Sequence, residues 1–183
     1  MSVNTGTVIL ALAGPNTIML LSDIAASALA RAVLRRLSVF AGSFDLERAL
    51  AVAQGDDLDA EAALDALAEL VNKSLVGLDA IEPPRYRLLD STRLYAAERL
   101  AEAGESAAVL RAHAQAMVHC AEQAIERYWH LGDAAWLALA EPDADDLEAA
   151  ADRAVAAGDA QSAAAPLEAL MRLDAQRGVD STR

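Results

Sequence analysis

The sequence has little of what a secreted protein or a sheet-rich fold requires. Its 183 residues include a single cysteine, Cys120, so no internal disulfide can form. Aromatic residues make up only 4% of the chain, whereas Ala and Leu are abundant, and this composition favours closely packed helices. We therefore expect a mostly α-helical, cytoplasmic protein with little β-structure, in which Cys120 is a buried structural residue.

Basic charge is also scarce, with 15 Lys and Arg against 28 Asp and Glu, a formal net charge of −13. Such a field repels phosphate backbones and anionic membrane surfaces, which makes nucleic acid an unfavoured partner and a membrane an unexpected one. The apolar stretches before residue 31 are interrupted by Gly14-Pro15 and have no preceding Lys or Arg. They predict neither a signal peptide nor a membrane-spanning segment.

The sequence lacks the motifs of common catalytic and metal centres. No G-x-x-x-x-G-K-[ST] phosphate loop occurs, so this chain is not expected to hydrolyse ATP alone. The three histidines and Cys120 have no metal-ligand spacing. The acidic groups 56–59 and 143–146 precede predicted helices, where carboxylates serve as caps. We expect no enzyme, no cofactor and no metal, because an enzyme would need a pocket that nothing in the sequence indicates.

Apolar spacing predicts three helices followed by a hairpin in the first half. Residues 18–40 have an apolar stripe that includes Leu29, and Gly42 is suited to the position after the helix. A helix over 46–54, capped by Asp45 or Ser43, precedes a third over 56–72, whose apolar face includes Leu64. Short β-compatible runs at 74–78 and 85–89 come next. This order predicts a winged helix, completed by a helix that Asp90 or Ser91 caps and that Gly104 ends.

The second half predicts only helices, over 106–128, 133–140, 143–157 and 159–176, separated by Gly132, Pro142 and Gly158. We expect antiparallel helical-repeat hairpins, with Tyr128, Trp129 and Trp136 packed between helices. The predicted organisation is a divergent N-terminal segment (1–22), a winged-helix domain (23–104) and a truncated helical-repeat domain (105–183).

Three ordered blocks carry a resemblance to a known family: LRRLSVFAGSF at 34–44, LVNKSLV at 70–76 and RYRLLDSTRLYA at 85–96. Together they resemble bacterial signal-transduction ATPases and the large AfsR- and LuxR-like transcriptional regulators, over about residues 23–176. The resemblance implies a winged helix followed by tetratricopeptide-like repeats, after a nucleotide-binding core that this chain lacks. The chain thus looks like the middle of a longer regulator, as a fragment or a truncated gene product. In such ATPases a winged-helix histidine can touch ADP, but the histidines here lie at 113, 119 and 130.

Two hypotheses for function follow. The first is a non-catalytic regulatory and protein-interaction module, whose partner is another protein or the nucleotide-binding domain of a parent regulator. The alternative is a DNA-binding winged-helix transcription factor, which requires a continuous positive face over the third helix and the wing. That helix instead carries four acids, Asp59, Glu61, Asp65 and Glu69.

The basic residues that could contact a partner domain or a phosphate are five arginines. Ion-paired or solvated surface is the alternative interpretation of each of them. They are Arg31, Arg35, Arg36, Arg85 and Arg87.

Overall fold

The computed structural model describes residues 26–55, 57–79 and 83–180. The predicted segment 1–22 and the first part of the helix expected from residue 18 lie outside these ranges. The first half contains α3 (Ala28–Leu37), α4 (Leu46–Ala53), α5 (Ala60–Asn72), β1 (Gly77–Asp79), β2 (Arg85–Arg87) and α6 (Asp90–Glu102). The second half contains α7 (Ser106–Tyr128), α8 (Asp133–Ala140), the 3-10 helix η1 (Glu141–Asp143), α9 (Ala144–Ala156) and α10 (Ala160–Asp180). The fold is therefore mostly helical, as predicted.

Local capping fixes where the helices of the first half begin. Ser27 caps α3, Asp45 caps α4 and Asp59 caps α5, each side chain accepting a hydrogen bond from a backbone N–H in the first turn. The predicted cap at Asp90 or Ser91 is wrong, because α6 begins after Leu89 without a side-chain cap. The prediction that Gly104 ends this helix is confirmed, since Gly104 adopts φ +71° and its N–H donates to the carbonyl of Ala101.

The wing is a two-stranded antiparallel sheet in which Gly77 pairs with Arg87 and Asp79 with Arg85. A residue before α4 extends this sheet, because Phe44 and Tyr86 exchange two backbone hydrogen bonds of 2.9 and 2.7 Å. The three helices, this bridge and the hairpin form a winged helix-turn-helix domain. The sequence pattern predicted the hairpin but not the bridge at Phe44.

The stripe predicted for the first helix is buried at Val33, Leu37 and Phe40 but not at its first position, whereas the predicted face of α5 is rotated from the one observed. Leu29 is 46% exposed and Leu64 is 42% exposed, although both were expected in the core. On α5 the buried positions are Ala63, Ala66, Leu67 and Leu70. Three-residue and four-residue spacings both fit this helix, and alanine lets the α3 and α5 backbones approach closely on the face that is buried.

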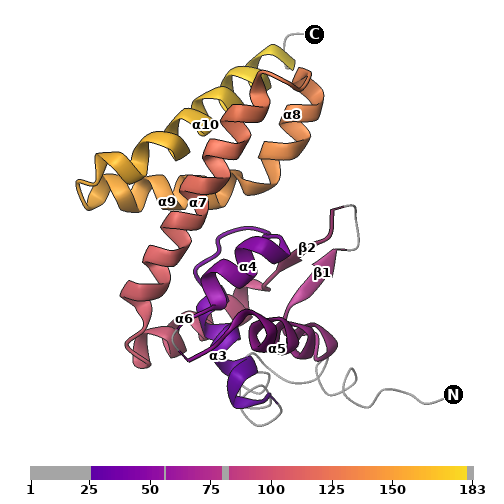
Figure 1. Ribbon diagram of the computed structural model, residues 1–183, viewed down its shortest axis with the longest axis vertical. Helices are drawn as coiled ribbons and strands as arrows, with labels where there is room; N and C mark the ends of the chain where they lie inside the picture. Colours follow the sequence, from indigo (N-terminus) through magenta and orange to yellow (C-terminus); the bar gives the residue numbers. More distant parts are fainter. Residues whose placement is uncertain (1–25, 56, 80–82, 181–183) are drawn as a thin grey trace, which may run out of the picture.

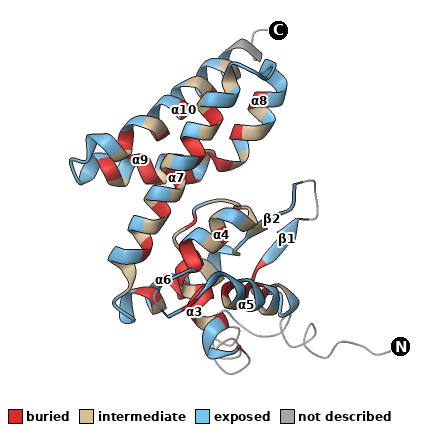
Figure 2. Ribbon diagram, viewed as in Figure 1, coloured by how far each residue is buried: buried red, intermediate tan, exposed pale blue. Residues whose placement is uncertain are grey.

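Helix α7 connects the winged helix to α8, α9 and α10, which are called the upper helices below (Figure 1). It packs against α4 of the winged helix as well as against α9 and α10. One continuous apolar core runs through both halves: Phe40 and Val52 of the winged helix share it with Met117, Leu147 and Ala169 (Figure 2). The two halves are therefore joined by shared burial as well as by the chain.

The predicted aromatic core between α7 and α8 is partly correct. Trp136 is fully buried and its indole N–H donates to the carbonyl of Ala124 at 2.7 Å. Trp129 is 72% exposed, because it lies just past the end of α7, where its ring contacts Tyr128 and the guanidinium of Arg172. One tryptophan is thus buried and the other faces solvent.

Candidate functional site

The junction between the wing and the upper helices is organised around the buried carboxylate of Asp143 in η1. Arg85 of β2 lies 2.5 Å from its Oδ1, and Arg48 of α4 lies 3.1 Å from its Oδ2. Arg85 also donates to the carbonyl of Pro142 at 3.1 Å and to the hydroxyl of Ser43 at 2.8 Å. One carboxylate of the second half therefore holds both the wing and the helix-turn-helix.

A second carboxylate, Asp146 of α9, holds the loop between α3 and α4. It accepts hydrogen bonds from the backbone N–H groups of Ala41 at 2.7 Å and Gly42 at 3.1 Å. Gly42 is thus a donor to another helix, and its predicted left-handed position after α3 is wrong, since α3 ends at Leu37. Capping was predicted for the acids at 143–146, but neither Asp143 nor Asp146 caps a helix through its side chain.

Asp146 also contacts His113, a fully buried residue of α7. Asp146 Oδ1 lies 3.0 Å from His113 Nε2, while Arg153 donates to His113 Nδ1 at 2.7 Å. Because a guanidinium can only donate, Nδ1 is the acceptor and the ring proton lies on Nε2, directed at Asp146. The ring also packs edge-on against Phe40, with centroids 5.0 Å apart. His113 therefore joins α9 to the winged helix.

Cys120 lies beside this network on α7 and is buried, as predicted. Arg48 contacts its sulfur at 2.9 Å and the carboxylate of Asp143 lies 3.5 Å away. Burial, reinforced by the negative charge of Asp143, raises the pKa of the thiol to about 12. Cys120 is accordingly a protonated thiol at neutral pH, not a nucleophile.

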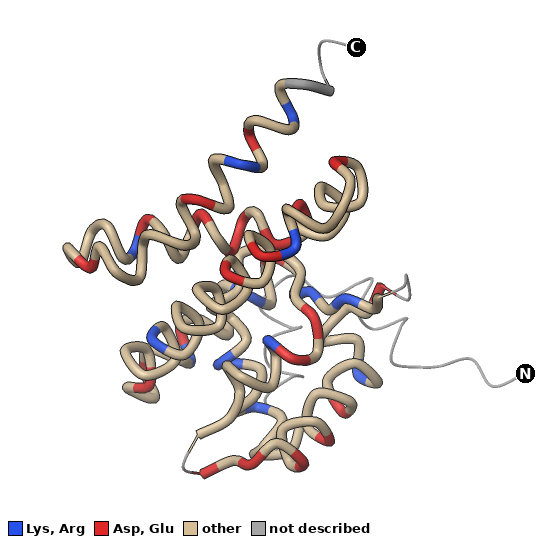
Figure 3. The backbone as a smooth tube through the Cα atoms, turned by 45° about the horizontal axis from the view of Figure 1, so that its top comes forward, with Lys and Arg blue, Asp and Glu red and all other residues tan. Residues whose placement is uncertain are grey.

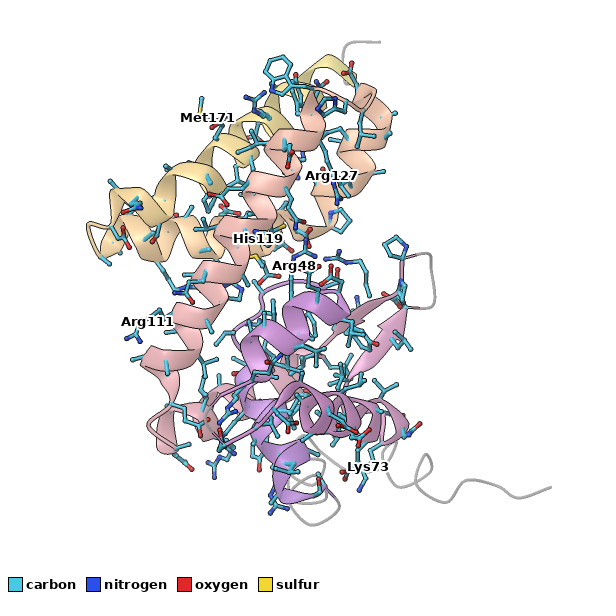
Figure 4. The ribbon with its side chains drawn as sticks, in the orientation of Figure 1. Arg48, Lys73, Arg111, His119, Arg127 and Met171 are labelled. Atoms are coloured by element: carbon cyan, nitrogen blue, oxygen red, sulfur yellow. The ribbon has the colours of Figure 1, made fainter. Side chains whose placement is uncertain are left out.

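A cavity of about 350 Å³ opens at the same junction. Its walls come from both halves: Glu47 and Arg48 belong to α4, His119 and Arg127 to α7, and Leu139 to α8. Figure 4 shows Arg48, His119 and Arg127 near the boundary between the halves, whereas Arg111 extends from the opposite side of α7. The volume lies in the range of small-molecule sites.

The five arginines predicted as contacts do not form one cluster. Arg36 is buried and bonded to the carbonyl of Ala53 at 2.8 Å, to Asp57 at 2.7 Å and to Glu105 at 3.2 Å. Arg35 makes a two-point contact with Glu105, with a shortest distance of 2.6 Å. Arg85 lies in the junction, and Arg87 is exposed on β2.

Two of these arginines, Arg31 and Arg35, line a second cavity of about 370 Å³ between α3 and α6. Arg99 and Glu102 of α6 and the apolar Leu34 of α3 also line it. The sequence analysis missed Arg99, for which the only signal was its spacing of three residues from Glu102, its ion-pair partner at 2.6 Å. Three guanidinium groups therefore line the groove, of which Arg35 is paired with Glu105 and Arg99 with Glu102.

The outward face of α5 is acidic, as the sequence indicated. Glu61 and Asp65 are exposed, and Glu69 pairs with Lys73 at 3.1 Å. Hydrogen bonding from Ser27, with a contribution from Lys73, lowers the pKa of Glu69 to about 2. Within the described ranges, basic residues are scattered and form no continuous positive surface across α5 and the wing (Figure 3).

No three His, Cys, Asp or Glu side chains of the described residues are grouped so that they could hold a metal ion. None of the helices found there combines the length and apolarity that crossing a lipid bilayer demands.

Comparison with known proteins agrees with the fold of the first half. Residues 26–101 match the winged helix-turn-helix domain family. A Mycobacterium tuberculosis (strain H37Rv) protein, provisionally named HTH-type transcriptional regulator Rv0890c, is 49% identical over 75 residues, which are 40% of this chain. A protein of the same organism without an assigned function, Rv0894, is 49% identical over 85 residues, or 44% of this chain.

These matches cover only part of each relative. The matched segment spans 8% of the first relative and 21% of the second, so most of each of those proteins lies outside the comparison. No solved structure matches the chain. Residues 26–101 therefore have a winged helix-turn-helix fold supported by both the structure and the sequence comparison, whereas the matched family does not extend to α7–α10.

Proposed function

We propose that this chain is a non-catalytic regulatory and protein-interaction module of a cytoplasmic transcriptional regulator or signal-transduction ATPase. In this proposal the upper helices form a tetratricopeptide-like array that controls the orientation of the winged helix. The observation that carries the proposal is the position of Asp143, which contacts Arg48 of the helix-turn-helix and Arg85 of the wing simultaneously. The family match and the relative named as a transcriptional regulator support the regulatory part.

In this proposal the upper helices control the winged helix by fixing its orientation through the ion pairs of Asp143. Desolvation offsets much of the Coulombic energy of a buried ion pair, so such pairs add little net stability, but removing one partner is costly. The Asp143 network can therefore hold one relative orientation of wing and helices while contributing modest net stability. A change in the upper helices that moves η1 would displace Arg48 and Arg85 together.

The groove between α3 and α6 is the proposed surface for the partner domain, whose acidic groups would compete with Glu105 and Glu102 for the arginines. Arg31, Arg35 and Arg99 line it, and guanidinium groups bind carboxylates and phosphates with good geometry. An acidic surface of a nucleotide-binding domain, or its bound phosphate, fits this chemistry. Of the other predicted arginines, Arg36 and Arg85 are engaged inside the chain and Arg87 remains on the exposed side of the wing.

DNA binding is the second candidate function, and the helix-turn-helix fold itself favours it. The charge of α5 opposes it, since Glu61 and Asp65 occupy the face that would enter a major groove. The two candidates differ in their expected affinity for duplexes.

The test is fluorescence anisotropy of the purified chain with random-sequence duplex DNA over a series of salt concentrations. The interaction-module proposal predicts no binding at physiological ionic strength. Micromolar binding that weakens steeply with salt would establish the DNA-binding function instead.

A further inference from the structure

The junction cavity has opposite charges on its two walls. Arg127 of α7 and Glu47 of α4 both line it, and each is exposed. Neither has an ion-pair or hydrogen-bond partner for its side chain in the part of the chain that the structure describes. They also do not pair with each other, so the cavity separates an available guanidinium from an available carboxylate.

The remaining charged groups of the cavity already neutralise one another. Arg48 pairs with Asp45 at 2.6 Å and with Asp143 at 3.1 Å, and Arg85 pairs with the other oxygen of Asp143. These four groups therefore contribute two positive and two negative charges, which cancel. Arg127 and Glu47 are left to recognise charges on a ligand.

His119 adds a polar side chain to the wall that contains Arg127. The side-chain amide of Gln123 lies 2.8 Å from His119 Nε2. Because the amide nitrogen donates, Nε2 accepts and the ring carries its proton on Nδ1. The imidazole thus offers a donor for a carboxylate, while Ala51, Ala138 and Leu139 supply apolar surface.

The geometry points to a binding site for a small zwitterionic metabolite of the amino-acid type, with its carboxylate at Arg127 and His119 and its ammonium group at Glu47. The apolar wall would receive the side chain of the metabolite. A dianion or a polyphosphate fits less well, since Arg127 is the one cation of the described cavity lining that lacks an ion pair and Glu47 would repel the additional negative charge. A purely apolar ligand would leave both charged walls without partners.

This inference goes beyond the proposed function, because it assigns a ligand to the junction itself. A molecule held by α4 on one side and α7 on the other binds only when both walls are in place. Its binding energy would consequently favour the observed orientation of the two halves over any orientation that separates them.

The experiment is calorimetric titration of the whole chain with each proteinogenic L-amino acid at millimolar concentrations, with amide chemical-shift mapping of any that binds. We expect at least one to bind and to shift resonances of α4 and α7. The N-acetylated and C-amidated forms of that amino acid should each bind at least tenfold more weakly, because each lacks one charge.

Matched variants locate the site. Arg127→Ala and Glu47→Gln should each weaken binding about tenfold or more, whereas Arg111→Ala should leave it unchanged. Arg111 is the control because it is an exposed arginine of the same helix, directed away from the cavity (Figure 4). All three residues are exposed, so the variants are expected to fold.

Three results would overturn the inference: no shift by any amino acid, equal loss in the Arg111 and Arg127 variants, or undiminished binding of the N-acetylated form. The last would indicate a simple carboxylate site. Since neither DNA nor a partner protein takes part in these titrations, their failure would leave the proposed regulatory function unaffected.

Discussion

The carboxylate of Asp143 lies 2.5 Å from the guanidinium of Arg85, although 58 positions separate the two residues in the chain. Both side chains are almost fully buried, and the contact brings η1 against the wing. The first basic residue of the wing is thus engaged by another part of the same protein. Arg87, two residues later, stays exposed.

Replacing Asp143 by Asn should destabilise the protein by about 3 kcal/mol, because Arg48 and Arg85 would remain buried without their carboxylate. Urea denaturation followed by circular dichroism measures this change. Asp145→Asn is the matched control, since Asp145 is exposed and two residues away, and it should alter the free energy of unfolding by no more than about 0.5 kcal/mol. Equal effects of the two substitutions would show that the Asp143 network is not what holds the junction.

Cys120 should react with a thiol reagent at pH 8 at least about 100-fold more slowly than an exposed cysteine, because it is buried and its pKa is raised to about 12. Asp143→Asn should accelerate the reaction, since it removes a negative charge beside the sulfur and loosens the junction. The reaction rate is followed by the absorbance of the chromophore that the thiol reagent releases. The rate in urea, where the thiol is accessible, provides the reference. A fast reaction in the native wild-type protein would contradict the buried position of the thiol.

The free energy of unfolding should depend on pH through the ionisation of Glu105. Hydrogen bonding from Arg35 lowers the pKa of Glu105 to about 2, against an ordinary value near 4.5. Because the folded-state pKa is the lower one, this stabilisation is complete above about pH 4.5 and is lost as the pH falls towards 2. Glu105→Gln should remove on the order of 2 kcal/mol at pH 7 and flatten the decline between these values.

The pH prediction is checked by urea unfolding at a series of pH values. Glu102→Gln is the control, since Glu102 is exposed and its ion-pair partner, Arg99, lies three residues earlier on the same helix. An unchanged pH profile in the Glu105 variant would show that the contact with Arg35 and Arg36 does not stabilise the folded chain.

Charge reversal on α5 should create affinity for DNA. The double substitution Glu61→Lys and Asp65→Lys changes the exposed face from acidic to basic, which adds phosphate contacts without altering buried positions. Anisotropy should then show binding that the wild type lacks and that weakens with salt, with a logarithmic slope of about −2 or steeper. If the double variant still does not bind, shape rather than charge excludes DNA from this face.

The sequence was sufficient to locate most elements, because their signals are local. The predicted ranges 106–128 and 133–140 coincide with α7 and α8, and the cap at Asp45 and the end at Gly104 follow from the requirements of single turns. Such features depend on residues within four positions of one another. Helix faces were harder to predict, since on α5 both Leu64 and Leu67 fit an apolar stripe and only packing decides between them.

The candidate site was not predictable in the same way. A carboxylate before a helix has the same local sequence whether it caps that helix or binds a distant arginine, so Asp143 and Asp146 were assigned to capping. Their partners Arg85, Ala41 and Gly42 lie 58 to 105 residues away, and no periodic pattern relates them. The prediction that the helical-repeat domain begins at residue 105 remains a proposal.

Helix α7 has a mechanical consequence. It is one uninterrupted helix of 23 residues, about 35 Å long, whose first half packs in the winged-helix core and whose last turns pack against α8 and α10. A stiff rod of that length converts a small rotation into a large displacement: tilting one end by about 10° moves the other by about 6 Å. Since α9 contacts His113 and the last turns contact α8 and α10, a change of packing at either place would be transmitted along α7 to the winged helix.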